Sequence, residues 1–105
     1  MSEPVVVTAI FTPVEGRKNN LAAALASTIP GVHAEQGCIL YAIHDAEDGT
    51  ITMLEKWASR DDLAVHAAGA PVAALNAAIE GLIASPVVVT LMDPIAAGTT
   101  EQGVL

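Results

Sequence analysis

A tryptophan and a histidine stand nine residues apart in the stretch LEKWASRDDLAVHAAGAP, residues 54–71. Imidazole exchanges protons near neutral pH, and an indole offers a flat apolar wall for an aromatic ring. Glu55 precedes Trp57 by two residues, so both side chains share one face if this segment is a strand. If a helix carries His66 back over that face, a carboxylate, an indole and an imidazole converge in a small reactive pocket.

The same residues also fit a purely structural interpretation. Trp57 is then part of the core, and His66 is a partly buried histidine whose hydrogen bonds are satisfied. A carboxylate on an inward face must be paired, hydrogen-bonded or protonated. Glu55 could therefore orient His66, or pair with a basic residue such as Lys18 or Arg60. Residue types and spacing leave both interpretations open.

Other polar candidates precede this stretch. Tyr41 and His44 lie on opposite faces of a predicted strand, and Tyr41 either donates a hydrogen bond to a substrate oxygen or fills a subunit interface. We expect His44 and His33 at the surface. Cys38 is the single cysteine, and the histidines show no HxH or HxxxH spacing, so the sequence predicts no metal site.

The hydrophobic pattern predicts the elements that position these residues. Short β-branched or alternating runs predict strands over residues 5–11, 38–44, 50–57 and 85–94. A helical pattern covers residues 15–28 and is expected to break at Pro30-Gly31. Ser59 is a suitable N-cap for a second helix, and Pro71 for the first turn of the segment that follows.

This order, β-α-β-β-α-β, is that of a ferredoxin-like α+β domain with a four-stranded antiparallel sheet and both helical regions on one face. The strands are nevertheless apolar on both faces, as Val5 and Val7 against Val6 and Ile10 illustrate. The helix-free face then needs a cover, and a second subunit's sheet is the simplest one, which predicts a homodimer. We expect one domain over residues 1–94 and a flexible or partner-contacting tail over 95–105.

Composition narrows the classes of partner. The chain has 105 residues, 52% of them hydrophobic and 15% charged, which fits one folded domain. Twelve acidic residues against four basic ones give a net charge of −8, so nucleic acid and anionic membrane surfaces are poor partners. The N-terminus lacks the basic region of a signal peptide, and no apolar run reaches membrane-spanning length. We expect a cytoplasmic protein.

The segment GCILYAIHDAEDGTITMLEKWASRDDLAVHAAGAPVAAL, residues 37–75, resembles the antibiotic biosynthesis monooxygenase domain of the dimeric α/β-barrel superfamily. The shared features are the Gly-Cys-X-X-Tyr opening, a short acidic hairpin, the Glu-Lys-Trp strand end, and a histidine one helix later. With the flanking elements the likeness covers about residues 4–94. It implies a ferredoxin-like fold whose sheets pair between two subunits into a dimeric α/β barrel.

The resemblance also implies an activity. The characterised enzymes of this family include monooxygenases that oxidise polycyclic phenols or hydroquinones with O2 without metal or flavin, because the deprotonated substrate itself supplies the electrons. We therefore expect a cofactor-independent monooxygenase acting on a small phenol, hydroquinone or polyketide-like aromatic, with His66 transferring a proton and Trp57 as the stacking wall. The residues expected to bind the substrate are Tyr41, Glu55, Met53 and Phe11. The alternative is a non-catalytic dimeric module that binds a small hydrophobic metabolite.

Overall fold

The computed structural model describes residues 3–105 as an α+β domain with the predicted order of elements. Along the chain these are β1 (Val5–Phe11), α1 (Lys18–His33), β2 (Cys38–Asp45), β3 (Ile51–Trp57), α2 (Arg60–Ala67), α3 (Ala70–Ile79) and β4 (Val88–Met92). The four strands form one sheet in the order β2-β3-β1-β4, and every neighbouring pair is antiparallel. This is the ferredoxin-like arrangement that the sequence predicts, with two helices in the second helical region.

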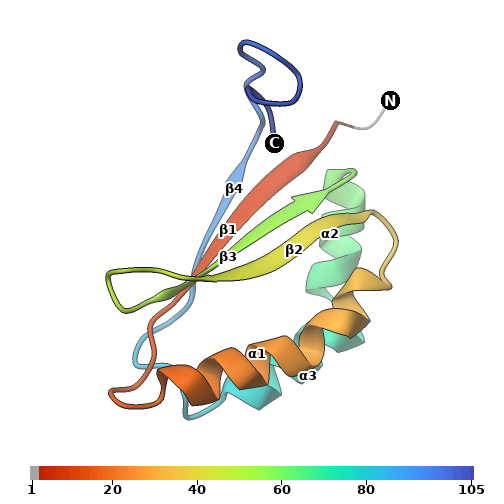
Figure 1. The fold of residues 1–105 in the computed structure, drawn as a ribbon. Helices are drawn as coiled ribbons and strands as arrows, with labels where there is room; N and C mark the ends of the chain where they lie inside the picture. The colour runs from red at the N-terminus through yellow and green to blue at the C-terminus, as the bar shows by residue number, and fades with distance from the viewer. Residues whose placement is uncertain (1–2) are drawn as a thin grey trace.

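The long helices α1 and α3 lie side by side across one face of the sheet, and α2 stands apart from them at one end (Figure 1). Cross-strand pairs show which side chains share this covered face: Val5 lies opposite Trp57, and Val7 opposite Glu55. The buried members of the covered face are Val5, Val7, Ala9, Phe11, Tyr41, Ile51, Met53, Glu55 and Trp57. The alternation predicted for β3 is therefore confirmed.

The predicted break in α1 is wrong. The helix runs over Lys18–His33 and contains Pro30 in its last turns. The proline forgoes one backbone hydrogen bond, but its ring is exposed to solvent and the next turn buries Val32 completely in the core. Gly31 lies where α1 passes α3, and a Cβ atom there would make an ordinary van der Waals contact with Pro71, at 4.0 Å. The helix therefore continues through Pro30-Gly31.

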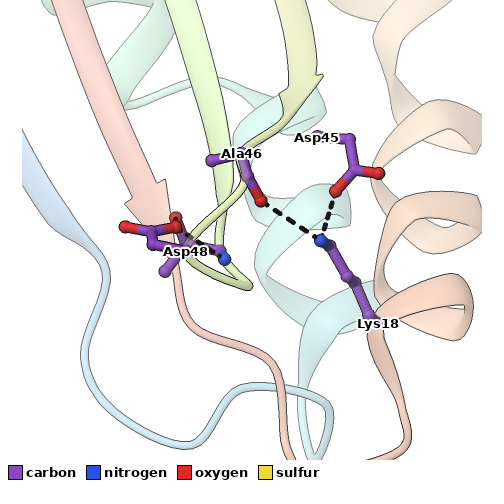
Figure 2. Close-up of polar contacts among 5 residues, drawn as sticks. Lys18, Asp45, Ala46 and Asp48 are labelled. Carbon is purple, nitrogen blue, oxygen red and sulfur yellow. Dashed lines mark hydrogen bonds and ion pairs between the residues drawn. The ribbon is translucent and has the colours of Figure 1, made fainter.

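The β2–β3 hairpin is fastened to the start of α1 (Figure 2). Lys18 forms an ion pair with Asp45 and donates a hydrogen bond of 3.4 Å to the carbonyl of Ala46. Within the turn, Oδ1 of Asp48 accepts hydrogen bonds from the backbone N–H of Thr50 at 3.0 Å and from its hydroxyl at 2.6 Å. These bonds fix the hairpin register, which determines that the side chains of Tyr41 and Glu55 lie on the covered face of the sheet.

The helix α2 begins as predicted. The hydroxyl of Ser59 accepts a hydrogen bond of 3.1 Å from the backbone N–H of Asp62, and Asp61 and Asp62 occupy the first turn. Among residues 3–105 no single helix is long and apolar enough to cross a membrane, and α2 and α3 reach that length and composition only together, with a bend of 53° between them.

Residues 95–105 fold into a turn beyond β4, drawn in dark blue in Figure 1. The backbone N–H of Gly103 donates to the carbonyl of Thr99 at 2.8 Å. Val104 lines a shallow depression together with Val6 and Met92, which belong to the helix-free face of the sheet. The segment therefore covers one edge of that face.

Candidate functional site

A cavity of about 430 Å³ lies between the covered face of the sheet and the helices α2 and α3. Its walls are mainly apolar, and the apolar wall residues include Phe11, Met53, Leu63, Leu75, Val89 and Leu91. Val89 and Leu91 are half-exposed because no helix covers β4, so the cavity opens on that side. Its volume lies in the range of pockets that enclose small organic molecules.

Polar groups line one end of this cavity. Tyr41 on β2 and Glu55 on β3 are direct cross-strand partners, and α2 brings His66 over them. All three side chains are buried. The structure therefore brings together three of the residues predicted for the site, and Phe11 and Met53 join them as apolar walls.

Aromatic rings set the orientation of His66. Its imidazole lies on the indole of Trp57, with ring centroids 4.4 Å apart and an angle of 33° between the planes. The ring of Tyr41 meets both edge-on, at 5.4 Å from His66 and 6.3 Å from Trp57. Packing on two sides therefore holds the imidazole plane.

Trp57 lies one layer behind the cavity. Its side chain has no exposed surface and contributes nothing to the cavity wall, because His66 lies over its face. The placement of the indole as a wall against which a substrate lies is thus corrected. The reason is that α2 places the imidazole of His66 between the indole and the cavity, where we had expected the substrate to lie. Trp57 supports the imidazole instead.

Glu55 takes its hydrogen bond from the same indole. The Nε1–H of Trp57 donates to Oε1 of Glu55 at 2.9 Å. Burial raises the pKa of Glu55, while the indole hydrogen bond and the nearby His66 lower it, and the net shift is upward. A carboxyl group with a raised pKa in an apolar cavity can exchange a proton with a bound molecule.

The basic residues considered as partners of Glu55 bind elsewhere. Lys18 pairs with Asp45 at the hairpin, and the guanidinium of Arg60 bonds to Asp93 at 2.9 Å. The alternative in which Glu55 pairs with Lys18 or Arg60 is therefore wrong. Both basic residues pair with exposed carboxylates, in the hairpin and just after β4. An ion pair with these carboxylates costs less desolvation than one with the buried Glu55 would.

The sequence did not reveal Glu35, which contacts His66 from the side away from the cavity. Oε2 of Glu35 lies 2.6 Å from Nδ1 of His66 across 31 residues of sequence. The loop carrying Glu35 is held beside α2, because Gly37 adopts a φ of +82° and packs against the carboxylate of Asp62. Asp62 and His66 are four residues apart and share one helix face. In this loop conformation the carboxylate of Glu35 reaches the imidazole of His66.

Three polar atoms of the buried residues that line the cavity have no protein partner. Among residues 3–105, every fully buried polar side-chain atom has a hydrogen-bond partner, whereas Nε2 of His66, the hydroxyl of Tyr41 and Oε2 of Glu55 have none. These atoms must therefore reach open space, and the cavity supplies it. Burial, and to a lesser extent Glu55 and Glu35, raise the pKa of Tyr41, so its hydroxyl stays a donor.

The remaining candidates lie outside the cavity. His44 is exposed, with Nδ1 3.2 Å from the carbonyl of Thr52, and exposed His33 has Nε2 3.0 Å from the carbonyl of Tyr41. Burial raises the pKa of the Cys38 thiol, which disfavours the reactive thiolate. Within the described part of the chain, no three His, Cys, Asp or Glu side chains gather to hold a metal ion.

A ferredoxin-like domain with an apolar cavity between sheet and helices, and with a phenol, a carboxyl group and an imidazole at one end, has the features that are typical of small-molecule sites. Comparison with known proteins agrees with this class. The family model described as "Antibiotic biosynthesis monooxygenase" matches residues 4–78. The chain belongs to this family.

Relatives match over nearly the whole chain. The Mycobacterium tuberculosis protein named "Putative monooxygenase Rv0793" is 31% identical over 96 residues, which are 90% of this chain and 95% of that protein. Its solved structure superimposes with a TM-score of 0.83 and covers 92% of this chain and 100% of that one. The structure of SO0527 from Shewanella oneidensis is 27% identical, with a TM-score of 0.77 over 88% of this chain and 91% of that one.

Proposed function

We propose that this protein is a monooxygenase that uses O2 to oxidise a small phenol, hydroquinone or polyketide-like aromatic, with no metal or flavin. Family membership supports the reaction class. The observation that carries the proposal is the unpartnered Nε2 of His66 at the polar end of an apolar cavity, beside a buried carboxyl and a phenol. An aromatic ring fits the apolar walls, while its hydroxyl meets the polar end.

The chemistry begins with proton transfer. Nε2 of His66 takes the phenolic proton, and the resulting phenolate gives one electron to O2, forming superoxide and a substrate radical. The pair recombines at a ring carbon to form a peroxide anion, which takes back the proton held by His66 and becomes a hydroperoxide. Its O–O bond breaks as the proton on that carbon leaves and joins the departing hydroxide. One oxygen stays as the new carbonyl and the other departs as water. For a phenol with a free para position, phenol plus O2 thus gives quinone plus water.

The other cavity residues stabilise this sequence. Tyr41 donates to a substrate oxygen and so stabilises negative charge that develops there. Glu55 accepts from a second substrate hydroxyl or relays a proton. Phe11 and Met53 hold the ring against the sheet, and the apolar walls exclude water from the radical pair.

We also propose that the working unit is a homodimer that pairs the helix-free sheet faces. The apolar side chains on this face are Val6, Ile10, Leu40, Ala42, Leu54, Val88 and Met92. Ile10, Val88 and Met92 are exposed in the single chain. Threonine side chains lie among them, as Thr8 between Leu54 and Thr90 shows. A largely apolar sheet face of this kind favours burial against a matching surface, and a second copy provides one.

Oxygen uptake tests the activity. Metal-free and flavin-free protein is mixed with a panel of hydroquinones and polycyclic phenols, and O2 consumption is compared with autoxidation. His66→Ala is expected to lower the rate by about 10²-fold or more while calorimetry still detects ligand binding. The matched control is His33→Ala, which removes an exposed histidine at the end of α1, outside both the cavity and the helix-free face of the sheet. Binding without O2 uptake in the wild type would contradict the proposal and favour a non-catalytic metabolite-binding module.

A further inference from the structure

Glu35 gives His66 a second fixed contact. Oε2 of Glu35 and Nδ1 of His66 lie 2.6 Å apart, and the two side chains are only 16% and 6% exposed. A short contact between a ring nitrogen and a carboxylate is among the stronger hydrogen bonds in proteins. At this burial water competes with it weakly, so it persists in the folded protein.

We propose that Glu35 is a positioning residue that selects the tautomer of His66 whose Nε2 can accept a proton from the substrate. An ionised carboxylate only accepts hydrogen bonds, so the proton of a neutral imidazole must lie on Nδ1. Nε2, which faces the cavity, then carries a lone pair. Neutral imidazole side chains in water favour the opposite tautomer. The use of Nε2 as a base rests on the proposed function, whereas the tautomer itself does not.

Two contacts in different directions fix the ring. Stacking on Trp57 at 4.4 Å holds its plane, and the bond to Glu35 decides which edge faces the carboxylate. A half-turn of the imidazole would place a carbon atom against Oε2 and forfeit the hydrogen bond. One orientation is therefore favoured, and in it Nε2 faces the cavity.

The backbone around the pair allows this close approach. Gly69 links α2 to α3, and a Cβ atom there would lie 3.3 Å from Oε1 of Glu35 and 3.2 Å from the carbonyl of Val65. Its N–H donates to the carbonyl of His66 at 3.0 Å. A glycine at this link leaves space for the Glu35 carboxyl group beside the end of α2.

An isosteric substitution separates tautomer selection from packing. Glu35→Gln keeps the size of the side chain, but a carboxamide donates as well as accepts and so stops selecting one tautomer. Nitrogen-15 NMR of labelled histidine at about pH 9, well above the ordinary imidazole pKa, reports which nitrogen carries the proton. We expect Nδ1–H at His66 in the wild type and a shift toward Nε2–H in Glu35→Gln. Glu47→Gln, at an exposed hairpin position, is the matched control and should match the wild type.

Kinetics supply the second readout. With a substrate found in the oxygen-uptake panel, Glu35→Gln is expected to lower kcat by roughly 10- to 100-fold with little change in KM. The reason is that the cavity walls stay intact while the base is protonated on the wrong nitrogen. A packing role alone would leave both the tautomer and kcat unchanged in this variant.

The outcomes separate this inference from the proposed function. A wild-type His66 with its proton on Nε2 would overturn the inference, as would a Glu35→Gln variant with unchanged tautomer. The expected tautomer shift without O2 uptake by any form would support Glu35 as the positioning residue and defeat the monooxygenase. Backbone amide spectra establish that each variant folds. If Glu35→Gln does not, the wild-type spectrum decides alone.

Discussion

Glu55 combines a buried carboxyl group with a single hydrogen bond from the protein, to Trp57. Because burial raises its pKa, the folded chain binds this proton more tightly than the unfolded chain does. Its stabilising contribution is complete below the unfolded pKa, near 4.3, and is lost as the pH rises through the higher folded pKa. As far as Glu55 is concerned, the fold is therefore less stable at neutral pH than in acid.

We expect Glu55→Gln to stabilise the protein at pH 7 relative to the wild type and to change stability less at pH 4. Glutamine keeps an oxygen that can accept from the indole of Trp57 but cannot ionise. Urea denaturation at the two pH values measures the difference, with Glu47→Gln as the exposed control. An equal effect of Glu55→Gln at both pH values would mean that its folded pKa is not raised.

Tyr41 allows ligand binding to be separated from folding. Its hydroxyl has no partner among residues 3–105, so Tyr41→Phe should change the free energy of unfolding by less than about 0.5 kcal/mol. If the hydroxyl donates to a substrate oxygen, kcat/KM falls by about tenfold, the worth of one hydrogen bond near 1.4 kcal/mol. Steady-state oxygen uptake and urea denaturation test the two halves. A large loss of stability would show that the hydroxyl has a structural partner.

At the scale of elements, the loop between α1 and β2 depends on Gly37. Its φ of +82° disfavours any side chain, and a Cβ atom would overlap the carboxylate of Asp62. Gly37→Ala should cost about 1–2 kcal/mol from backbone strain, with an added cost from displacing Asp62. Gly49 is the matched control, because its φ is +93° and nothing lies within 4 Å.

Urea denaturation of both variants measures these costs. Gly49→Ala should show the strain alone, whereas Gly37→Ala should lose more stability and also alter the histidine NMR signals of His66, since the loop carries Glu35. Equal losses in the two variants, with His66 unchanged, would mean that the loop adapts without moving Glu35.

The element pattern was predictable from the sequence because it rests on local signals. The alternation in β3 and the cap at Ser59 needed no distant contact. The end of α1 was not predictable, since the Pro30-Gly31 signal is overridden by packing of Val32 and by the crossing at Pro71. Tertiary contacts outweigh local propensity there.

The candidate site divides in the same way. Tyr41 and Glu55 share the covered face because strand alternation and hairpin register place them there, so the sequence could predict their meeting. The bond between Glu35 and His66 depends on a loop conformation 31 residues away, and no periodicity encodes it. The layering of His66 over Trp57 likewise follows from the angle of α2, which packing decides.

The whole molecule presents an unusual imbalance, because helices cover one sheet face and leave an apolar face open. The C-terminal turn reaches only the edge near Val6 and Met92. The centre of the open face includes Leu54, which lies between Thr8 and Ala42 on the neighbouring strands. A second copy laid across this face would bury the remaining apolar surface, and a stable interface needs roughly 1,200 Å² or more in total.

A charge at Leu54 tests this arrangement. In a two-fold pairing of these faces, Leu54→Glu places a carboxylate from each copy in the interface. Desolvation of the two carboxylates opposes association, and repulsion between them opposes it further. Light scattering after size exclusion should give the mass of two 10.7 kDa chains for the wild type and of one for the variant. Val65→Glu is the matched control, because Val65 is 70% exposed on α2, away from the sheet. If Val65→Glu dissociates the dimer and Leu54→Glu does not, the interface lies on the helical side of the molecule. The open sheet face must then have another cover.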